Sequence, residues 1–311
     1  MKVKLFTHID LDGIGCYILA IYAFGISNVD VVYCKNPQET SDKVKEFILN
    51  GYYSEYDCVF ITDISINEEV AILINSMDIK NIIKLLDHHK TAEFLNVYSW
   101  ATVEEYISND KHNCGTFALY HYLQIYEHSI GVVDRFVETV RQYDTWEFKT
   151  KYFTEIPKQY NDLLSIMGRE DFINMILQKL TNNSLEFTEV EKKLLMYEQK
   201  KIDGYIKMRK QRVIKKQVCG YSAGIVFAER NSSELGSDLC ETMPELDFVM
   251  IINPSYNISY RTNKDIDVSK IAQQIGGKGA GGHPKAAGST IDKKVTEGIV
   301  DWLLSEMYYE N

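Results

Sequence analysis

The sequence predicts an α/β protein with a parallel-sheet N-terminal domain, a long helical connector and a smaller α/β C-terminal domain. Three observations lead to this fold class. Apolar, strand-like runs alternate with helical segments in the first third of the chain, and the alternation resumes near its C-terminal end. The chain also has 311 residues, which is more than one hydrophobic core usually organises.

The N-terminal domain is predicted to span residues 1–184. Four of its segments are apolar almost throughout and are typical of strands: residues 3–8, 29–34, 58–64 and 82–89. Segments with helical character separate them, at residues 14–24, 40–49 and 68–77. Strands of this kind joined by helices are typical of a parallel sheet that is covered on both faces. From residue 115 to about residue 180 the pattern becomes mostly helical.

The connector is predicted to span residues 185–218, with one long polar amphipathic helix over residues 186–217. The C-terminal domain, residues 219–311, returns to alternating strands and helices. Its expected strands are residues 224–229, 247–253 and 257–262, and its expected helices are residues 234–241, 268–275 and 294–308. A glycine-rich loop precedes the last of these helices. A domain of this length has an ordinary size for an independent unit.

Composition excludes several classes of protein. With 45% hydrophobic and 25% charged residues, the chain is not disordered. Its apolar runs are far shorter than the roughly 20 residues of a membrane span. The N-terminus opens directly into a strand-like segment and shows no signal-peptide pattern. Six cysteines without a CxxC pair favour reduced core residues over a disulfide or zinc framework. We therefore expect a cytoplasmic protein with no membrane partner.

The net charge of -10 argues against bulk electrostatic attraction to nucleic acid. A basic stripe at residues 200–216 nevertheless holds eight lysines and arginines against Asp203 alone. This stripe is either a solvated helix face or a surface that faces phosphates, and the sequence leaves both interpretations open.

Acidic residues and histidines follow three of the predicted strands. They are His8, Asp10 and Asp12 after the first strand, Asp63 at the end of the third, and Asp87, His88 and His89 at the end of the fourth. Ligands of open parallel sheets bind outside the carboxyl ends of the strands. We therefore expect these side chains to converge on one crevice.

Several carboxylates in one crevice cannot all stay ionised without a compensating cation, because like charges raise one another's pKa. A mixture of carboxylate and imidazole ligands without thiolates favours Mn²⁺, with Mg²⁺, Fe²⁺ or Co²⁺ as alternatives. The ligands are too many for one ion and predict a pair about 3.5 to 4 Å apart, as used for displacement at phosphorus. A single aspartate at a strand end is more often a turn residue or a helix cap, but capping alone does not explain three such strand ends.

Four motifs in this order resemble those of the DHH family of phosphoesterases. They are THIDLDGIG at 7–15, ITDIS at 61–65, LDHHKT at 86–91 and RQYDTW at 141–146. AGGHPKAAG at 280–288 resembles the signature of the associated DHHA1 domain. Within the family, the spacing of the first motif, VRQYDTWEF around Asp144 and SSELGSDL at 232–239 are most similar to the bacterial nano-RNase B type.

The resemblance implies a two-metal phosphodiesterase of the exonuclease type, which hydrolyses very short RNA to nucleoside 5'-monophosphates. It also implies a ligand set: His8, Asp10 and Asp63 for one metal, and Asp12, Asp63, His88 and Asp144 for the other. Asp63 would bridge the ions, because a carboxylate has two oxygens. His89 would be free to bind a phosphate oxygen or the leaving group, and Asp87 would orient a ligand histidine. Asp63, Asp87 and His89 are thus the expected catalytic residues.

The C-terminal domain is expected to hold the substrate across a gap from the catalytic crevice, which would favour short substrates. Backbone N–H groups of Gly281 and Gly282 suit a concave anion site, and His283 and Arg261 would add charge-assisted hydrogen bonds. The expected partner is short single-stranded RNA or a small nucleotide.

Three alternatives stay open. The same site suits a 3'-phosphoadenosine 5'-phosphate phosphatase or a hydrolase of linear or cyclic dinucleotides. A metal-dependent pyrophosphatase shares the first-domain motifs but lacks the glycine and histidine signature. A nucleotide-sensing module without catalysis predicts missing ligands, whereas every expected ligand is present. The oligomeric state also stays open, a homodimer included.

Overall fold

The computed structural model describes residues 1–77, 79–125, 131–254, 257–276 and 280–291. The chain divides into two compact units, Met1–Leu195 and Met196–Asn311. Their border falls inside the segment predicted as the connector, and the predicted domain limits stay predictions. The predicted helix at 294–308 and the centre of the glycine-rich loop, 277–279, lie outside the described residues.

A five-stranded parallel sheet forms the centre of the first unit, with the strand order β2-β1-β3-β4-β5. Its strands are β1 (Val3–His8), β2 (Val29–Cys34), β3 (Cys58–Thr62), β4 (Ile83–Asp87) and β5 (Ala101–Val103). The predicted parallel sheet is therefore confirmed. The short edge strand β5 was not predicted, because three residues carry too little pattern.

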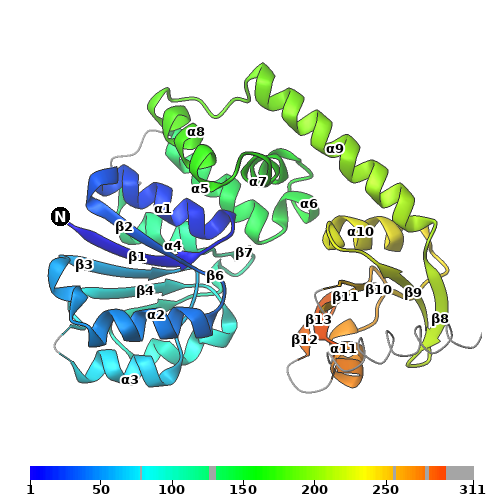
Figure 1. Cartoon of the computed structure of the whole chain (residues 1–311), viewed down its shortest axis with the longest axis horizontal. Helices are drawn as coiled ribbons and strands as arrows, with labels where there is room; N and C mark the ends of the chain where they lie inside the picture. The colour runs from blue at the N-terminus through cyan, green and yellow to red at the C-terminus, as the bar shows by residue number, and fades with distance from the viewer. Residues whose placement is uncertain (78, 126–130, 255–256, 277–279, 292–311) are drawn as a thin grey trace, which may run out of the picture. The chain divides into compact units, whose positions relative to one another are not determined.

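Helices cover both faces of this sheet, as Figure 1 shows for α2 and α3 on one side and α1 on the other. They are α1 (Leu11–Phe24), α2 (Pro37–Leu49) and α3 (Glu68–Ser76), with short 3₁₀ turns η1 (Ile26–Asn28), η2 (Tyr52–Glu55) and η3 (Lys90–Val97). Each face has its own apolar core. Ile14 and Phe136 belong to the core beside α1, and Val44 and Ile74 belong to the core beside α2 and α3.

Polar side chains begin the helices directly after the strands. Asp10 accepts a hydrogen bond from the backbone of Gly13 and caps α1, and Asn36 caps α2, where Pro37 takes the first helical position. Asn67 caps α3 in the same way. Such caps satisfy N–H groups that the helix itself leaves free, and a proline at the first position has no N–H to satisfy. These short turns keep the polar residues at the carboxyl edge of the sheet.

The rest of the first unit is mostly helical, as predicted. Its helices are α4 (Gly115–Tyr122), α5 (Gly131–Asp144), α6 (Glu147–Thr150), α7 (Ile156–Met167) and α8 (Arg169–Thr181). A small antiparallel hairpin, β6 (Tyr106–Ser108) and β7 (Lys111–His112), precedes them. Apolar side chains of α4, α5, α7 and α8 pack against α1 in one core.

The second unit is a six-stranded mixed sheet with the order β12-β13-β11-β10-β9-β8. Its strands are β8 (Ile214–Val218), β9 (Tyr221–Phe227), β10 (Phe248–Ile252), β11 (Asn257–Arg261), β12 (Gly281–His283) and β13 (Ala286–Thr290). Two helices, α10 (Ser232–Thr242) and α11 (Val268–Gly276), pack against it. Only β9 and β10 pair in parallel; the other neighbouring strands are antiparallel.

The predicted helix over residues 186–217 is too long at both ends. The helix α9 runs from Glu189 to Lys210, and Ile214–Val218 forms the strand β8. At the C-terminal end the reason is a tight hairpin between β8 and β9. Cys219 and Gly220 both have positive φ, 53° and 83°, which suits a two-residue turn between antiparallel strands.

The glycine-rich segment is more regular than the predicted loop. Gly281–His283 and Ala286–Thr290 pair as the antiparallel strands β12 and β13. Glycines and alanines do not show the alternation of large apolar and polar side chains that predicts a strand, so the sequence did not predict this pairing. None of the helices in the described part of the chain combines the length and apolar character needed to cross a membrane.

Candidate metal centre

The structure brings the predicted acidic residues and histidines together at the carboxyl edge of the parallel sheet. His8 ends β1, Asp63 follows β3, and His88 follows β4. Asp144, the last residue of α5, comes from outside the sheet. Three groups of side chains present ligand atoms that lie within 4.8 Å of one another: His8, Asp10 and Asp63; Asp12, His88 and Asp144; and Asp63, Asp87, His88 and His89.

Asp63 connects the groups through its two oxygens. Its Oδ1 lies 3.2 Å from His88 Nε2, and its Oδ2 lies 3.8 Å from His8 Nδ1. His88 Nε2 also lies 3.8 Å from Asp12 Oδ2 and 3.6 Å from Asp144 Oδ2. The carboxylate of Asp63 thus faces one group of potential ligands on either side.

Asp63 is held in an unusual environment. It is 2% exposed, its φ is 57°, and its Oδ2 accepts no hydrogen bond from the residues that the structure describes. Burial raises its pKa well above the usual range, and the charges of Asp12, Asp10 and Asp144 raise it further. Burial and the charges of Asp12 and Asp10 also raise the pKa of Asp144. A bound cation would compensate these charges, so the donor set fits divalent metal ions.

Asp12 is fixed by the N-terminus of α4, a contact that sequence reasoning missed. Gly115 N–H donates to its Oδ2 at 2.6 Å, and Thr116 N–H donates to its Oδ1 at 2.8 Å. The Thr116 hydroxyl also donates to the Asp12 backbone carbonyl at 2.7 Å. The positive end of a helix favours a carboxylate. The sequence signal for this contact is the run NCGT before an apolar helix, but this run does not identify Asp12 as the residue that the helix contacts.

Gly115 also permits the close approach of α4 to β3. A Cβ atom at this position would lie 2.4 Å from the Cβ of Asp63. Only glycine allows this contact without displacement of one of the two elements.

The three histidines differ in their surroundings. The hydrogen bond with Asp10 raises the pKa of His8, whose ring also contacts the backbone carbonyl of Lys35. Burial lowers the pKa of His88 and favours the neutral ring, which is the form that binds metals. His89 Nδ1 lies 2.7 Å from Asp87 Oδ1, and this hydrogen bond raises the pKa of His89 to about 9.

Asp87 is fully buried and also accepts the backbone N–H of His88 at 2.8 Å. We expected it to orient a ligand histidine. The ring that it contacts is instead that of His89, because Asp87 Oδ1 meets the His89 side chain and only the backbone of His88.

A buried arginine supports the end of α5. Arg141 is 0% exposed and donates to Glu138 at 2.7 Å, to Glu147 at 2.8 Å and to the His112 carbonyl at 3.0 Å. The neighbouring Arg141 overcomes the effect of burial and lowers the pKa of Glu138 to about 2. These bonds tie the last turn before Asp144 to the hairpin and to α6. No motif in the sequence predicts this network.

The expected binding residues of the second unit share one sheet. Arg261 in β11 and His283 in β12 both pair with Ala286, which lies in the strand between them, β13. Directly paired residues point to the same face of a sheet, so Arg261 and His283 do so here. The Arg261 guanidinium donates to the Tyr260 carbonyl at 3.0 Å and to Ser233 Oγ at 3.3 Å. Gly281 and Gly282 precede His283 in the same strand, β12.

The basic stripe is partly neutralised. Arg209 pairs with Glu229, Lys210 with Asp238, Lys215 with Glu245 and Lys201 with Glu198, at distances of 2.5 to 3.0 Å. Half of its eight basic residues therefore have acidic partners, which favours the interpretation as a solvated surface.

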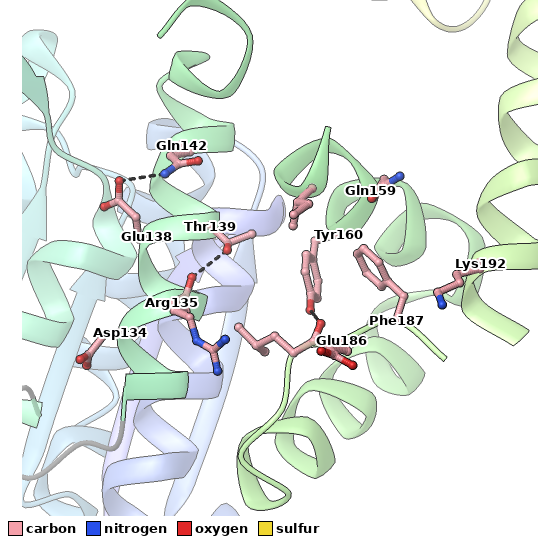
Figure 2. A pocket seen from close by; sticks show the side chains of 12 residues that line it. Asp134, Arg135, Glu138, Thr139, Gln142, Gln159, Tyr160, Glu186, Phe187 and Lys192 are labelled. Carbon is pink, nitrogen blue, oxygen red and sulfur yellow. Dashed lines mark hydrogen bonds between the residues drawn. The ribbon is translucent and has the colours of Figure 1, made fainter. Parts of the chain in front are cut away.

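A large pocket of the first unit does not lie at the acidic cluster. A pocket of about 760 Å³ lies between α5, α7 and residues 185–192, and Figure 2 shows Tyr160 and Phe187 within it. Its lining residues include none of the potential metal ligands. A smaller pocket of about 160 Å³ does touch the cluster, through His8, Asp63 and His89. Chemistry, rather than size, therefore identifies the site.

Comparison with known proteins decides the family. The chain is 37% identical over 300 residues to "Oligoribonuclease NrnB" of Bacillus subtilis, covering 94% of this chain and 74% of that protein. The chain belongs to the DHH/DHHA1 phosphoesterases. Residues 227–307 of this phosphoesterase match the DHHA1 domain family. It is also 24% identical to a "3',5'-cyclic-nucleotide phosphodiesterase" of Helicobacter pylori, covering 94% of this chain and 93% of the relative.

Solved structures support the fold of this metal-dependent phosphoesterase. RecJ of Thermus thermophilus, solved with Mn²⁺, matches with a TM-score of 0.60 at 13% identity, over 94% of this chain and 50% of RecJ. The pGpG-specific phosphodiesterase PggH of Vibrio cholerae matches with a TM-score of 0.53 at 12% identity, over 100% of both chains.

Proposed function

We propose that this phosphoesterase uses two divalent metal ions, most favourably Mn²⁺, to hydrolyse very short RNA to nucleoside 5'-monophosphates. The observation that carries the proposal is the pair of ligand groups on either side of Asp63, in a chain 37% identical to an oligoribonuclease. The six cysteines are free thiols, in keeping with the cytoplasm as the place of action.

His8, Asp10 and Asp63 would hold one ion, and Asp12, Asp63, His88 and Asp144 would hold the other. The ions would lower the pKa of a water molecule to produce the nucleophile and would neutralise charge that develops on the phosphate. The N-terminus of α4 keeps Asp12 in place for this task, and burial keeps the ring of His88 neutral.

His89 would act on the substrate directly. Its Nδ1 shares a proton with Asp87, which leaves Nε2 for a phosphate oxygen or the leaving group. With a pKa of about 9 the ring is protonated near neutral pH, so Nε2 can donate a charge-assisted hydrogen bond. Asp87 would orient the ring and stabilise its charge.

The second unit would bind the remainder of the substrate. Arg261 and His283 are charged or polar groups on one face of the sheet, and the backbone N–H groups of Gly281 and Gly282 lie in β12, the strand that ends with His283. Short single-stranded RNA is the partner that we propose.

The test is a product analysis. The protein is incubated with Mn²⁺ and end-labelled RNAs, from dinucleotides to about twenty-four nucleotides, and kcat/KM is compared between lengths. We expect 5'-monophosphates, with dinucleotides to tetranucleotides cleaved fastest. Faster cleavage of the longest RNA would contradict the proposal.

The same assay separates the alternatives. 3'-Phosphoadenosine 5'-phosphate and cyclic dinucleotides are included, because a relative at 24% identity is named a cyclic-nucleotide phosphodiesterase. Preferential turnover of either compound would replace RNA as the proposed substrate. Binding of these compounds without any turnover in Mn²⁺ would instead support a nucleotide-sensing module.

A further inference from the structure

The small pocket beside the metal centre has a lining that the metal ligands do not account for. Three of its residues, His8, Asp63 and His89, belong to the groups described above. The other six come from the segments after β2, β3 and β4: Lys35, Asn36, Pro37, Ile64, Ser65 and Thr91. Four of these six carry side chains that can donate hydrogen bonds.

Lys35 supplies a positive charge to this pocket. Its backbone is fixed on both sides, since its N–H donates to Glu39 Oε2 at 2.8 Å and its carbonyl contacts the ring of His8. Glu39 Oε1 in turn accepts a hydrogen bond from the Lys43 ammonium group at 2.7 Å. The structure shows no ion pair for the Lys35 ammonium group within the described residues, so this charge is available to a ligand.

Ser65 supplies a hydroxyl to the wall of this pocket. The residue is 8% exposed, lines the pocket, and its Oγ makes no hydrogen bond to the described part of the chain. A hydroxyl that lines a pocket and makes no hydrogen bond within the described residues can donate one to a ligand there. Asn36 caps α2 through its Oδ1, and its amide N–H groups, which make no hydrogen bond within the described ranges, can donate at the positive end of that helix.

We propose that this pocket binds the phosphate next to the scissile phosphate of a short oligonucleotide, with Lys35 and Ser65 as its contacts. The inference rests on the proposed function, because the metal ions must first compensate the charge of Asp63. A volume of about 160 Å³ accommodates a phosphate and part of its ribose, whereas complete ligands of drug size fill pockets of about 300 Å³ or more. Lysine is a suitable point charge for a phosphate.

The test compares one dinucleotide in three forms, with a phosphate at its 5' end, at its 3' end, and at neither end. Wild type should show a higher kcat/KM for one of the phosphorylated forms. Lys35→Ala should reduce this preference about tenfold or more, mainly through KM, as expected for one lost hydrogen bond from a charged group. Ser65→Ala should reduce it less, and Lys35→Arg should retain part of it.

The matched control is Lys45→Ala, which removes an exposed lysine that pairs with Glu69 on the surface. This variant should keep the wild-type preference. No preference in wild type, or an unchanged preference in Lys35→Ala, would overturn the inference. An equal loss for all three forms would also overturn it, because Lys35 would then contact the scissile phosphate or support His8.

A binding measurement keeps the inference separate from the proposed function. Calorimetry with adenosine 5'-monophosphate and adenosine, in Mn²⁺, measures the contribution of the phosphate in wild type and in Lys35→Ala. The pocket requires that the variant loses affinity for the monophosphate and not for the nucleoside, whichever dinucleotides are cleaved. Equal binding of the monophosphate by wild type and Lys35→Ala would overturn the inference. If RNA is not cleaved but Lys35→Ala still loses affinity for the monophosphate alone, only the proposed function would be contradicted.

Discussion

The candidate metal centre of the first unit and the proposed binding residues of the second unit are built in different ways. In the first unit, Asp12, Asp63 and Asp87 are buried, and Asp12 and Asp87 accept backbone N–H groups. In the second unit His283 is exposed, and the Arg261 guanidinium donates to the Tyr260 carbonyl and to Ser233 Oγ. A preorganised centre supplies transition-state stabilisation, whereas groups near a sheet edge suit substrate binding. Changes in the candidate metal centre should therefore reduce kcat, and changes in the proposed binding residues of the second unit should raise KM.

The largest effect is expected from Asp63→Asn. Loss of the shared carboxylate should release both ions and lower turnover by about 10³-fold or more, even in saturating Mn²⁺. Without metal the variant should be at least as stable as wild type. The pKa of Asp63 is raised by folding, so its ionised form destabilises the native state above the usual pKa of a carboxyl group. Kinetics and thermal unfolding in a chelator measure both effects. Asp42→Asn, on the surface of α2, serves as the control, and near wild-type turnover of Asp63→Asn would refute the bridge.

The next effect divides the two neighbouring histidines. His88→Ala should lower metal occupancy, whereas His89→Ala should keep both ions and lose about 10²- to 10³-fold in kcat, through one missing contact to the transition state. Metal analysis of the purified variants, with kinetics alongside, makes the distinction. The division of roles is wrong if both variants lose metal to the same extent.

Gly115→Ala tests whether the packing of α4 organises the centre. The new Cβ would lie 2.4 Å from the Cβ of Asp63, so α4 and Asp63 must separate, which should disturb the hydrogen bonds of α4 to Asp12. Such a loss of support should reduce metal affinity about 10- to 100-fold and stability by about 1 to 3 kcal/mol. Gly131→Ala is the matched control, because no atom lies within 4 Å of its added Cβ. Titration calorimetry with Mn²⁺ that shows equal affinities for the two variants would contradict the role of α4.

The smallest effect on kcat is expected in the second unit. Arg261→Ala should raise KM for a dinucleotide by an amount equivalent to about 1.5 to 3 kcal/mol, with little change in kcat. Hydrolysis of bis-p-nitrophenyl phosphate should change little, since that substrate engages mainly the metals. Arg212→Ala, in the basic stripe, is the comparison. If the stripe rather than Arg261 guides RNA, Arg212→Ala should have the larger effect and should reduce the salt dependence.

The sequence predicted the parts of this site that depend on local order. Consecutive residues after a strand must lie near its carboxyl end, so His8, Asp10 and Asp12 could be placed beside Asp63 and His88. Contacts between distant segments could not be placed in this way. Asp12 and Gly115 are 103 positions apart, and nothing in either segment identifies the other.

The predicted fold failed where local pattern is weak or misleading. Residues 214–218 continue the polar character of α9, yet they pair with β9 because Cys219 and Gly220 adopt a left-handed turn. The pairing of β12 with β13 depends on backbone hydrogen bonds between small residues, which leave no pattern of apolar side chains.

Anomalous diffraction at the manganese edge, from crystals grown with Mn²⁺, tests the central claim most directly. The account predicts two peaks on opposite sides of the Asp63 carboxylate, about 3.5 to 4 Å apart. One should be ligated by His8 and Asp10, and the other by Asp12, His88 and Asp144. A single peak, or peaks that Asp63 does not join, would contradict the two-metal centre.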